Sequence, residues 1–294
     1  MRWFSRFRQR PARQNASVTR ARQQRDYVLG AGEAEISRLD LQHCIFRWEL
    51  GDDFLAPVTN PRAILDVACG TGRWAREVAR RFPQANIIGF DINYEQIERS
   101  LAEGAARGSD LMPKNCTFVA GDALQRFAFA EGAFDLVMAR ATSAFMPASR
   151  YPELIAEMTR VARPGGWIEL RDFGLVRSGS RALTELTELF KNLMAARGQY
   201  PGVGPYLAEL IARAGLRAIQ VKTVTVRSGS QPSRGGRMML ADYLALMERL
   251  SPIMERAGLA SQVHWQQLLE VARQETTSQS AEGELTAAYG QREA

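Results

Sequence analysis

One stretch, Ala63–Trp74, constrains the fold of this chain more than any other: an apolar run reaches an acid, passes through a turn of small residues and enters a helical pattern. The run containing Leu65 and Val67 predicts a buried parallel strand, because such strands are apolar on both faces. Gly70 and Gly72 allow a tight turn and the close approach of a ligand. A strand, a glycine turn and a helix in this order predict a nucleotide-type pocket at the carboxyl end of the strand.

Two cofactors fit this turn. The segment Gly70–Ala75 matches the dinucleotide fingerprint G-x-G-x-x-G/A and Asp91 lies about twenty residues further on, so the glycines alone do not separate NAD from S-adenosylmethionine. Asp66 favours S-adenosylmethionine, because a carboxylate ahead of the loop repels an anionic pyrophosphate but can hold an ammonium group. NAD stays open as the second candidate.

Strand and helix patterns alternate over residues 62–173. The strands are expected at 62–67, 86–91, 116–120, 133–139 and 165–173, and the helices at 73–82, 93–107, near 122–127 as a short piece, and at 151–162. Such alternation predicts a parallel sheet with helices on both faces. Residues 217–227 and Glu284–Gly290 predict two more strands. The expected fold class is therefore α/β, a Rossmann-like doubly wound sheet of seven strands.

Acids follow the second and third of these strands. Asp91 ends one strand, where a carboxylate can accept hydrogen bonds from a ribose diol, or can simply cap the helix that follows. Gly121, Asp122 and Ala123 follow the next strand, where an acid can accept from an exocyclic amine such as that of adenine. The same three residues are also a common turn sequence.

Positive charge is concentrated at one end of the chain. The net charge is +6, but residues 1–25 contain eight arginines and no acid, and the remainder has 30 basic and 32 acidic residues. We expect residues 1–25 to form a disordered basic tail, because they lack a sustained apolar pattern. Trp3, Phe4 and Phe7 among the arginines leave open an interfacial helix on anionic lipid or an organelle transit peptide. Nucleic-acid enzymes carry positive charge on the folded domain, so a nucleic-acid substrate is disfavoured unless the tail supplies the contact.

The three cysteines, Cys44, Cys69 and Cys116, show no paired spacing. They indicate a reducing compartment and argue against a disulfide framework and against a zinc site. No apolar stretch is long enough to span a bilayer. We therefore expect a cytoplasmic protein with no transmembrane segment and no metal.

Helical patterns flank the alternating region. Residues 26–60 predict a helical cap with an apolar face at Ile36, Leu39, His43 and Phe46, and with acidic and basic residues, Glu35 and Arg38 among them, mostly off that face. Towards the other end, residues 227–236 are polar and are expected to form either a mobile loop at the pocket rim or a plain surface linker. Helices then follow over about 237–276, in which methionines such as Met239 either line a substrate pocket or form ordinary core.

The loop after the fourth strand, Arg140–Pro147, is expected where a transferable group meets its acceptor. It contains no Asp/Asn-Pro-Pro-Tyr tetrad, and no Pro-Cys dipeptide occurs in the chain, which counts against the commonest DNA methylation chemistries. A general base is needed only for a protonated, weakly acidic acceptor. His43, Tyr27, Arg140 and Asp172 are candidates facing the pocket, and none is assigned the catalytic role.

Four ordered motifs carry a family resemblance. Leu65–Gly72, Gly89–Asp91, Gly121-Asp122 and Arg163–Trp167 resemble the motifs of class I S-adenosylmethionine-dependent methyltransferases. The preceding segments Tyr27–Leu29, Glu33–Glu35, Arg38–His43 and Ala56-Pro57, with Glu169–Phe173, are similar to methyltransferases like the fungal secondary-metabolism regulator LaeA. Ala68 departs from the family pattern, which has glycine there.

The resemblance implies a set of cofactor-binding residues: Asp66, Ala68, Cys69, Gly70, Thr71 and Gly72 around the methionine part, Asp91 and Ile92 at the ribose, Gly121, Asp122 and Ala123 at the adenine, and Arg140 on the inner wall. Gln42 and His43 resemble residues that close over the cofactor. The resemblance further implies that residues 61–294 form the methyltransferase domain and that the last strand runs antiparallel between the 165–173 and 217–227 strands. The helices at about 237–276 would then be an insertion that caps the pocket or pairs two subunits in a homodimer.

Three functions are carried forward. The first is a methyltransferase that uses S-adenosylmethionine to methylate an oxygen or nitrogen of a small molecule, in secondary metabolism by the LaeA-like resemblance. The second is a methyltransferase-like regulatory or binding protein without turnover. The third and most distant is a nicotinamide-dependent enzyme, which binding of NAD would favour.

Overall fold

The structure, a computed structural model, describes residues 32–95, 97–98, 101–102, 112–229 and 232–294. The predicted tail at 1–25, the candidate Tyr27 and much of the predicted helix at 93–107 lie outside these residues. The main elements are α2 Glu33–Leu50, β1 Ala63–Val67, α3 Arg73–Arg81, β2 Asn86–Asp91, β3 Cys116–Ala120, β4 Phe134–Arg140, α5 Tyr151–Val161, β5 Ala162–Phe173, β6 Arg177–Ser178, α6 Arg181–Ala196, α7 Leu207–Arg213, β7 Arg217–Ser228, α8 Arg234–Arg256, α9 Gln262–Glu275 and β8 Ala281–Gln291.

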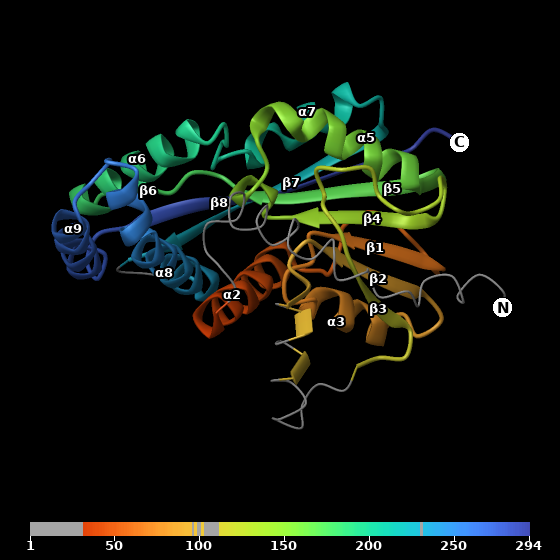
Figure 1. Ribbon diagram of the computed structural model, residues 1–294, viewed down its shortest axis with the longest axis horizontal. Helices are drawn as coiled ribbons and strands as arrows, with labels where there is room; N and C mark the ends of the chain where they lie inside the picture. The colour runs from red at the N-terminus through yellow and green to blue at the C-terminus, as the bar shows by residue number, and fades with distance from the viewer. Residues whose placement is uncertain (1–31, 96, 99–100, 103–111, 230–231) are drawn as a thin grey trace.

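A single mixed sheet runs through the molecule (Figure 1). Its strand order is β3-β2-β1-β4-β5-β8-β6, and β7 pairs with β8 as well. Strands β1 to β5 pair in parallel, and β8 runs antiparallel between β5 and β7. The predicted α/β class and the inserted antiparallel last strand are confirmed, with the two-residue β6 as an eighth strand. The order reverses between β1 and β4, where ligands bind in sheets of this kind.

Alternate residues of the strands build a core on each face of the sheet. Leu65 and Val137 belong to the layer covered by α5 and α7, and Ile64 and Leu136 to the layer covered by α3. This alternation follows from the two-residue period of a strand, and it explains why the central strands are apolar throughout. The central sheet is therefore shielded on both faces, and its carboxyl edge is left for a site.

Two further clusters join the flanking helices to the sheet. The cap helix α2 packs through Ile45 and Phe46 against β7 and β8. Helices α6, α8 and α9 share their own core around the fully buried Trp265, and they gather at one end of the sheet (Figure 1). The predicted helical pair at about 237–276 therefore corresponds to α8 and α9. Among the residues that the structure describes, no helix is both long and apolar enough to cross a bilayer.

Three local predictions were wrong. Residues 122–127 form a turn instead of a helix, because the Asp122 carboxylate accepts from the Leu124 N–H (2.8 Å) and its carbonyl accepts from the Gln125 N–H (3.0 Å). Strand β5 begins at Ala162 instead of 165, since the pairing resumes after a bulge that takes up the Pro-Gly-Gly turn. Half of the expected loop at 227–236 lies in β7 and α8, because the Ser233 hydroxyl caps α8, and residues 230 and 231 lie outside the described residues.

The cap helix α2 is buried on the side that faces α8 as well as on its apolar side. Glu35 and Arg38, expected mostly off its apolar face, are 0% and 4% exposed. They are tolerated there because each is paired: the Arg38 guanidinium donates to both Glu35 carboxylate oxygens, at 2.6 and 2.9 Å. Helix α2 is therefore enclosed between the sheet and α8.

Candidate functional site

The turn after β1 holds three residues in the left-handed conformation. Ala68, Gly70 and Gly72 have φ values of +55°, +58° and +70°. Glycine adopts this conformation freely, whereas an alanine is strained in it, which explains why the family pattern has glycine at the position of Ala68. Gly72 is required for a second reason: a Cβ there would lie 2.4 Å from the Phe118 ring. The turn is therefore shaped by backbone geometry and by close packing underneath it.

Asp66, one residue before the end of β1, is a buried acid. Both of its carboxylate oxygens lack a hydrogen-bond partner among the described residues, and the residue is 1% exposed. The nearest ion-pair partner is Arg140, at 3.7 Å. Burial raises the pKa of Asp66 to about 7, Arg140 lowers it and Asp91 adds to the rise. Buried polar groups are rarely left unpaired, so this carboxyl is suited to receive a donor from a ligand.

Asp91 ties the end of β2 to the glycine turn. Its carboxylate accepts from the Gly70 N–H at 2.8 Å and from the Asn93 N–H at 2.7 Å. Burial raises the pKa of Asp91 above its ordinary value, while these backbone bonds lower it. A backbone bond from Ile92 also lowers this pKa, so three of the roughly four acceptor positions of the carboxylate are used and one is left for a ligand.

The end of β3 lies beside Asp91. The Gly121 N–H donates to the Asp91 carbonyl at 2.9 Å, and a Cβ at Gly121 would lie 2.2 Å from the Phe90 ring. Gly121 is therefore needed by packing, independently of any ligand. Asp122 and Ala123 form the turn that follows, where both are half-buried.

Arg140, at the end of β4, joins the sheet to the cap helix. It lies beside Asp66, it stands 5.4 Å from the Trp74 ring centroid, and its Nη1 is 3.3 Å from His43 Nδ1. Nε2 of His43 is in turn 2.9 Å from the Glu77 carboxylate. Burial lowers the pKa of His43, against the bond to Glu77 that raises it, so the ring is neutral at pH 7. His43 therefore positions Arg140 and α2.

The cap helix touches the glycine turn directly. The Thr71 hydroxyl donates to the Asp40 carboxylate on α2 at 2.9 Å. Cys69 in the same turn is buried, and burial raises the pKa of its thiol well above the ordinary range, which keeps it protonated and unreactive. Together with Ile92, half-buried after β2, all the residues predicted to bind a cofactor lie along the carboxyl edge of β1 to β4.

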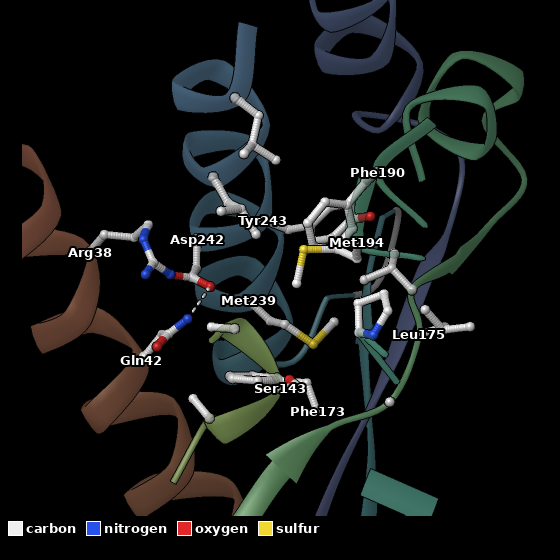
Figure 2. A pocket seen from close by; sticks show the side chains of 17 residues that line it. Arg38, Gln42, Ser143, Phe173, Leu175, Phe190, Met194, Met239, Asp242 and Tyr243 are labelled. Atoms are coloured by element: carbon white, nitrogen blue, oxygen red, sulfur yellow. Dashed lines mark hydrogen bonds and ion pairs between the residues drawn. The ribbon is translucent and has the colours of Figure 1, made fainter. Parts of the chain in front are cut away.

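A cavity begins where this edge ends. It measures about 90 Å³ and is lined from the β4 loop by Ala141, Ser143 and Ala144, from β5 and its continuation by Phe173, Gly174, Leu175 and Val176, from α2 by Arg38 and Gln42, and from elsewhere by Phe190, Met194, Pro201, Met239, Asp242, Tyr243, Leu246 and Leu250. Figure 2 shows Arg38, Gln42 and Asp242 on one side of it and Phe190, Met194 and Leu175 on the other. The cavity is mostly apolar with one polar side, which is typical of small-molecule sites.

Asp172, considered above as a base, holds the loop that lines this cavity. Its carboxylate accepts from the Ser143 N–H (2.9 Å), the Ser143 hydroxyl (2.6 Å), the Thr142 hydroxyl (3.1 Å) and the Phe173 N–H (2.8 Å). Four donors satisfy a carboxylate, so Asp172 acts as an anchor for Ser143.

Asp242 is the one acidic residue in the lining, and nothing in its local sequence marks it. Sequence reasoning missed it because its partners on α2 are about two hundred positions away along the chain.

Within the described part of the chain, no group of three or more His, Cys, Asp or Glu residues is arranged to hold a metal.

Comparisons with known proteins find methyltransferases and a regulator whose sequences are similar to this chain. The family described as "Methyltransferase domain" matches residues 64–166. The methyltransferase cpsF of Aspergillus campestris is 27% identical over 193 residues, which cover 63% of this chain and 66% of that protein. The secondary metabolism regulator LaeA of Aspergillus fumisynnematus is 32% identical over 146 residues, covering 49% of this chain and 35% of that protein. The chain thus spans less than two thirds of the length of these curated relatives.

A solved structure shares the fold. The phosphoethanolamine N-methyltransferase 2 of Haemonchus contortus, in complex with S-adenosyl-L-methionine, matches with a TM-score of 0.51 at 18% identity, over 87% of this chain and 57% of that one. The matched residues 64–166, with the strand order and the glycine turn, identify a class I S-adenosylmethionine-dependent methyltransferase domain in this chain, and LaeA proteins are among its relatives.

Proposed function

We propose that the protein is an enzyme that transfers a methyl group from S-adenosylmethionine to an oxygen or nitrogen of a small molecule in secondary metabolism. The observation that carries the proposal is the buried Asp66, which has no hydrogen-bond partner among the described residues and lies beside the left-handed turn. Arg140 is the ion-pair partner of Asp66, and the next residue along the chain, Ala141, lines the apolar cavity. A cofactor site and an acceptor site would therefore adjoin at the end of β4.

The residues present fit the cofactor. When bound, S-adenosylmethionine supplies a methyl group on an electrophilic sulfonium. Asp66 would hold the ammonium of its methionine part, and Ala68, Cys69, Gly70, Thr71 and Gly72 would surround that part. Asp91 and Ile92 would hold the ribose, and Gly121, Asp122 and Ala123 the adenine. Arg140 would line the inner wall of the cofactor site, and its guanidinium would provide a counter-charge for the buried Asp66 carboxylate.

The chain's contribution to the reaction would be positioning. Transfer of a methyl group requires the nucleophile and the methyl carbon to be in line, and most of the work is orientation and exclusion of water. The cap helix α2 lies against the glycine turn through Asp40 and reaches the cavity through Gln42. It would therefore cover the place where the two ligands meet. No residue is assigned as a general base.

The alternative is a regulatory or binding protein without turnover. The similarity to LaeA, a protein named as a regulator, favours it. Both functions use the same cofactor site, so they differ in whether methyl groups leave the protein. Conversion of S-adenosylmethionine to S-adenosylhomocysteine in the presence of candidate acceptors separates them.

The first test is calorimetric titration with S-adenosylhomocysteine. The wild type should bind with micromolar affinity, and Asp91→Ala should lose the binding. Asp135→Ala is a matched control, because Asp135 also accepts two backbone N–H bonds, from Arg62 and Ala63, but lies at the opposite end of its strand. The control should bind as the wild type does, and absence of binding by the wild type would refute the proposed function.

A further inference from the structure

Four charged residues form a buried cluster at the polar side of the cavity. Arg38 of α2 donates to the Asp242 carboxylate of α8 at 3.1 Å and to Glu35 at 2.6 and 2.9 Å. Nε of Arg249, on α8, lies 3.3 Å from Oε2 of Glu35, the oxygen that also accepts from Arg38 Nε, and the Arg249 side chain is 25% exposed. Asp242 is 5% exposed, so these charges are largely removed from water.

Asp242 is the member of the cluster best suited to meet a ligand. It lines the cavity, as do Arg38 and Gln42, and its second oxygen accepts from the Gln42 amide at 3.2 Å (Figure 2). Its two described bonds use two of roughly four acceptor positions. A ligand that donates a hydrogen bond here would meet a charged acceptor away from bulk water, where such bonds are strong.

The rest of the cavity selects for an apolar body. Phe190, Met194 and Leu175 lie across from Asp242 in Figure 2, and Met239 lies below it. A methionine side chain adapts its shape to an irregular partner. The volume of about 90 Å³ is several times the roughly 10–15 Å³ that one water molecule needs, so a small ring or a short hydrocarbon fits.

We propose that Asp242, oriented by Arg38 and Gln42, recognises the methyl acceptor, and that the acceptor is a largely apolar molecule carrying one neutral hydroxyl group. This inference rests on the proposed function, since the cavity is an acceptor site only if the carboxyl edge of β1 to β4 is a cofactor site. It makes Asp242 a specificity-determining residue, separate from the cofactor residues.

The charge balance of the cluster favours a neutral donor over a cation. The charge of Asp242 is already compensated by Arg38, which lies 3.1 Å away. A protonated amine would bring a further, unbalanced charge into a desolvated place. Burial raises the pKa of Asp242 to about 6, while Arg38 and Gln42 lower it, so the carboxylate is mostly ionised above pH 7 and ready to accept.

The test uses matched small probes, because the acceptor itself is unidentified. 4-Propylphenol donates a hydrogen bond, propylbenzene lacks the hydroxyl, 4-propylanisole masks it, and 4-propylbenzylamine carries a cation. Their affinities are measured by titration at about pH 7.5, with and without S-adenosylhomocysteine. The wild type should bind the phenol at least about tenfold more tightly than each of the other three.

Two variants test whether Asp242 causes the preference for the phenol. Asp242→Asn keeps the shape of the side chain and should reduce the preference to less than about threefold, since a neutral acceptor is weaker. Met247→Leu, buried on the same helix α8 but not among the residues that line the cavity, is the matched control and should keep it. Binding of S-adenosylhomocysteine and the melting temperature of each variant show that the fold is intact.

Each contrary result overturns the inference. Equal binding of the phenol and propylbenzene, tightest binding of the amine, no binding of any probe, or a preference that survives in Asp242→Asn would each do so. Failure of the wild type to bind S-adenosylhomocysteine counts instead against the proposed function, and the titrations without it show separately whether the cavity selects the hydroxyl.

Discussion

Replacing Asp66 by asparagine should stabilise the cofactor-free protein while weakening its hold on the cofactor. Asp66 is buried, and neither carboxylate oxygen has a hydrogen-bond partner among the described residues. Its pKa is raised from 3.8 to about 7, chiefly by burial. Above pH 7 the folded protein therefore carries a buried charge that an asparagine would not bring.

The size and the sign follow from linkage. Between about pH 4 and pH 7 the folded state keeps a proton that the unfolded state has already released, so this group lowers stability progressively as the pH rises, and the loss is complete above pH 7. At 1.36 kcal/mol for each unit of pKa, a shift of about three units corresponds to about 4 kcal/mol at pH 8. At about pH 5 the same reasoning gives only about 1–2 kcal/mol.

Urea unfolding of the two proteins without cofactor, at about pH 5 and about pH 8, measures both values. Asp66→Asn should gain up to about 4 kcal/mol over the wild type at the higher pH and clearly less at the lower one. Its affinity for S-adenosylhomocysteine should fall, because the ammonium loses its counter-charge. A variant that is no more stable than the wild type at pH 8, or a difference that does not change with pH, would refute the reasoning.

Substitutions at three further positions test other parts of the structure by thermal and urea unfolding. His43→Phe should cost about 1–2 kcal/mol because it removes the bond to Glu77 that holds the cap helix, and an unchanged stability would contradict this. Gly121→Ala should cost about 1–3 kcal/mol, since the new Cβ would lie 2.2 Å from the Phe90 ring; a neutral result would mean that the ring moves freely. Trp265→Ala should cost about 3–5 kcal/mol by leaving a cavity in the helical cluster, and Trp265→Phe should cost much less.

Much of the sheet was predictable because its signals are local. The apolar run before the glycine turn, the acid that ends β2 and the Pro-Gly-Gly turn early in β5 each depend on a few adjacent residues. The parallel sheet with helices on both faces then follows from the alternation of strands and helices. The inserted last strand was predictable only through the family resemblance, since no local pattern states which neighbours β8 pairs with.

The rest depends on contacts between distant segments. Asp122 favours a turn over a helix through its own side chain, a competition that propensity alone does not decide. In the sequence, Glu35 and Arg38 look like solvent-facing residues. They are buried because α8 packs against α2 and brings Asp242 and Arg249 into contact with them. The polar side of the cavity is therefore a product of tertiary packing, and no spacing along the chain marks it.

The cap helix has a thermodynamic consequence. Consecutive residues of α2 reach in two directions: Gln42 bonds to Asp242 at the cavity, and His43 bonds to Arg140 at the end of β4. A ligand that steadies this helix from one side lowers the entropy that a second ligand must give up on the other side. Such coupling is reciprocal. A bound acceptor would raise the affinity for the cofactor by the same factor by which a bound cofactor raises the affinity for the acceptor.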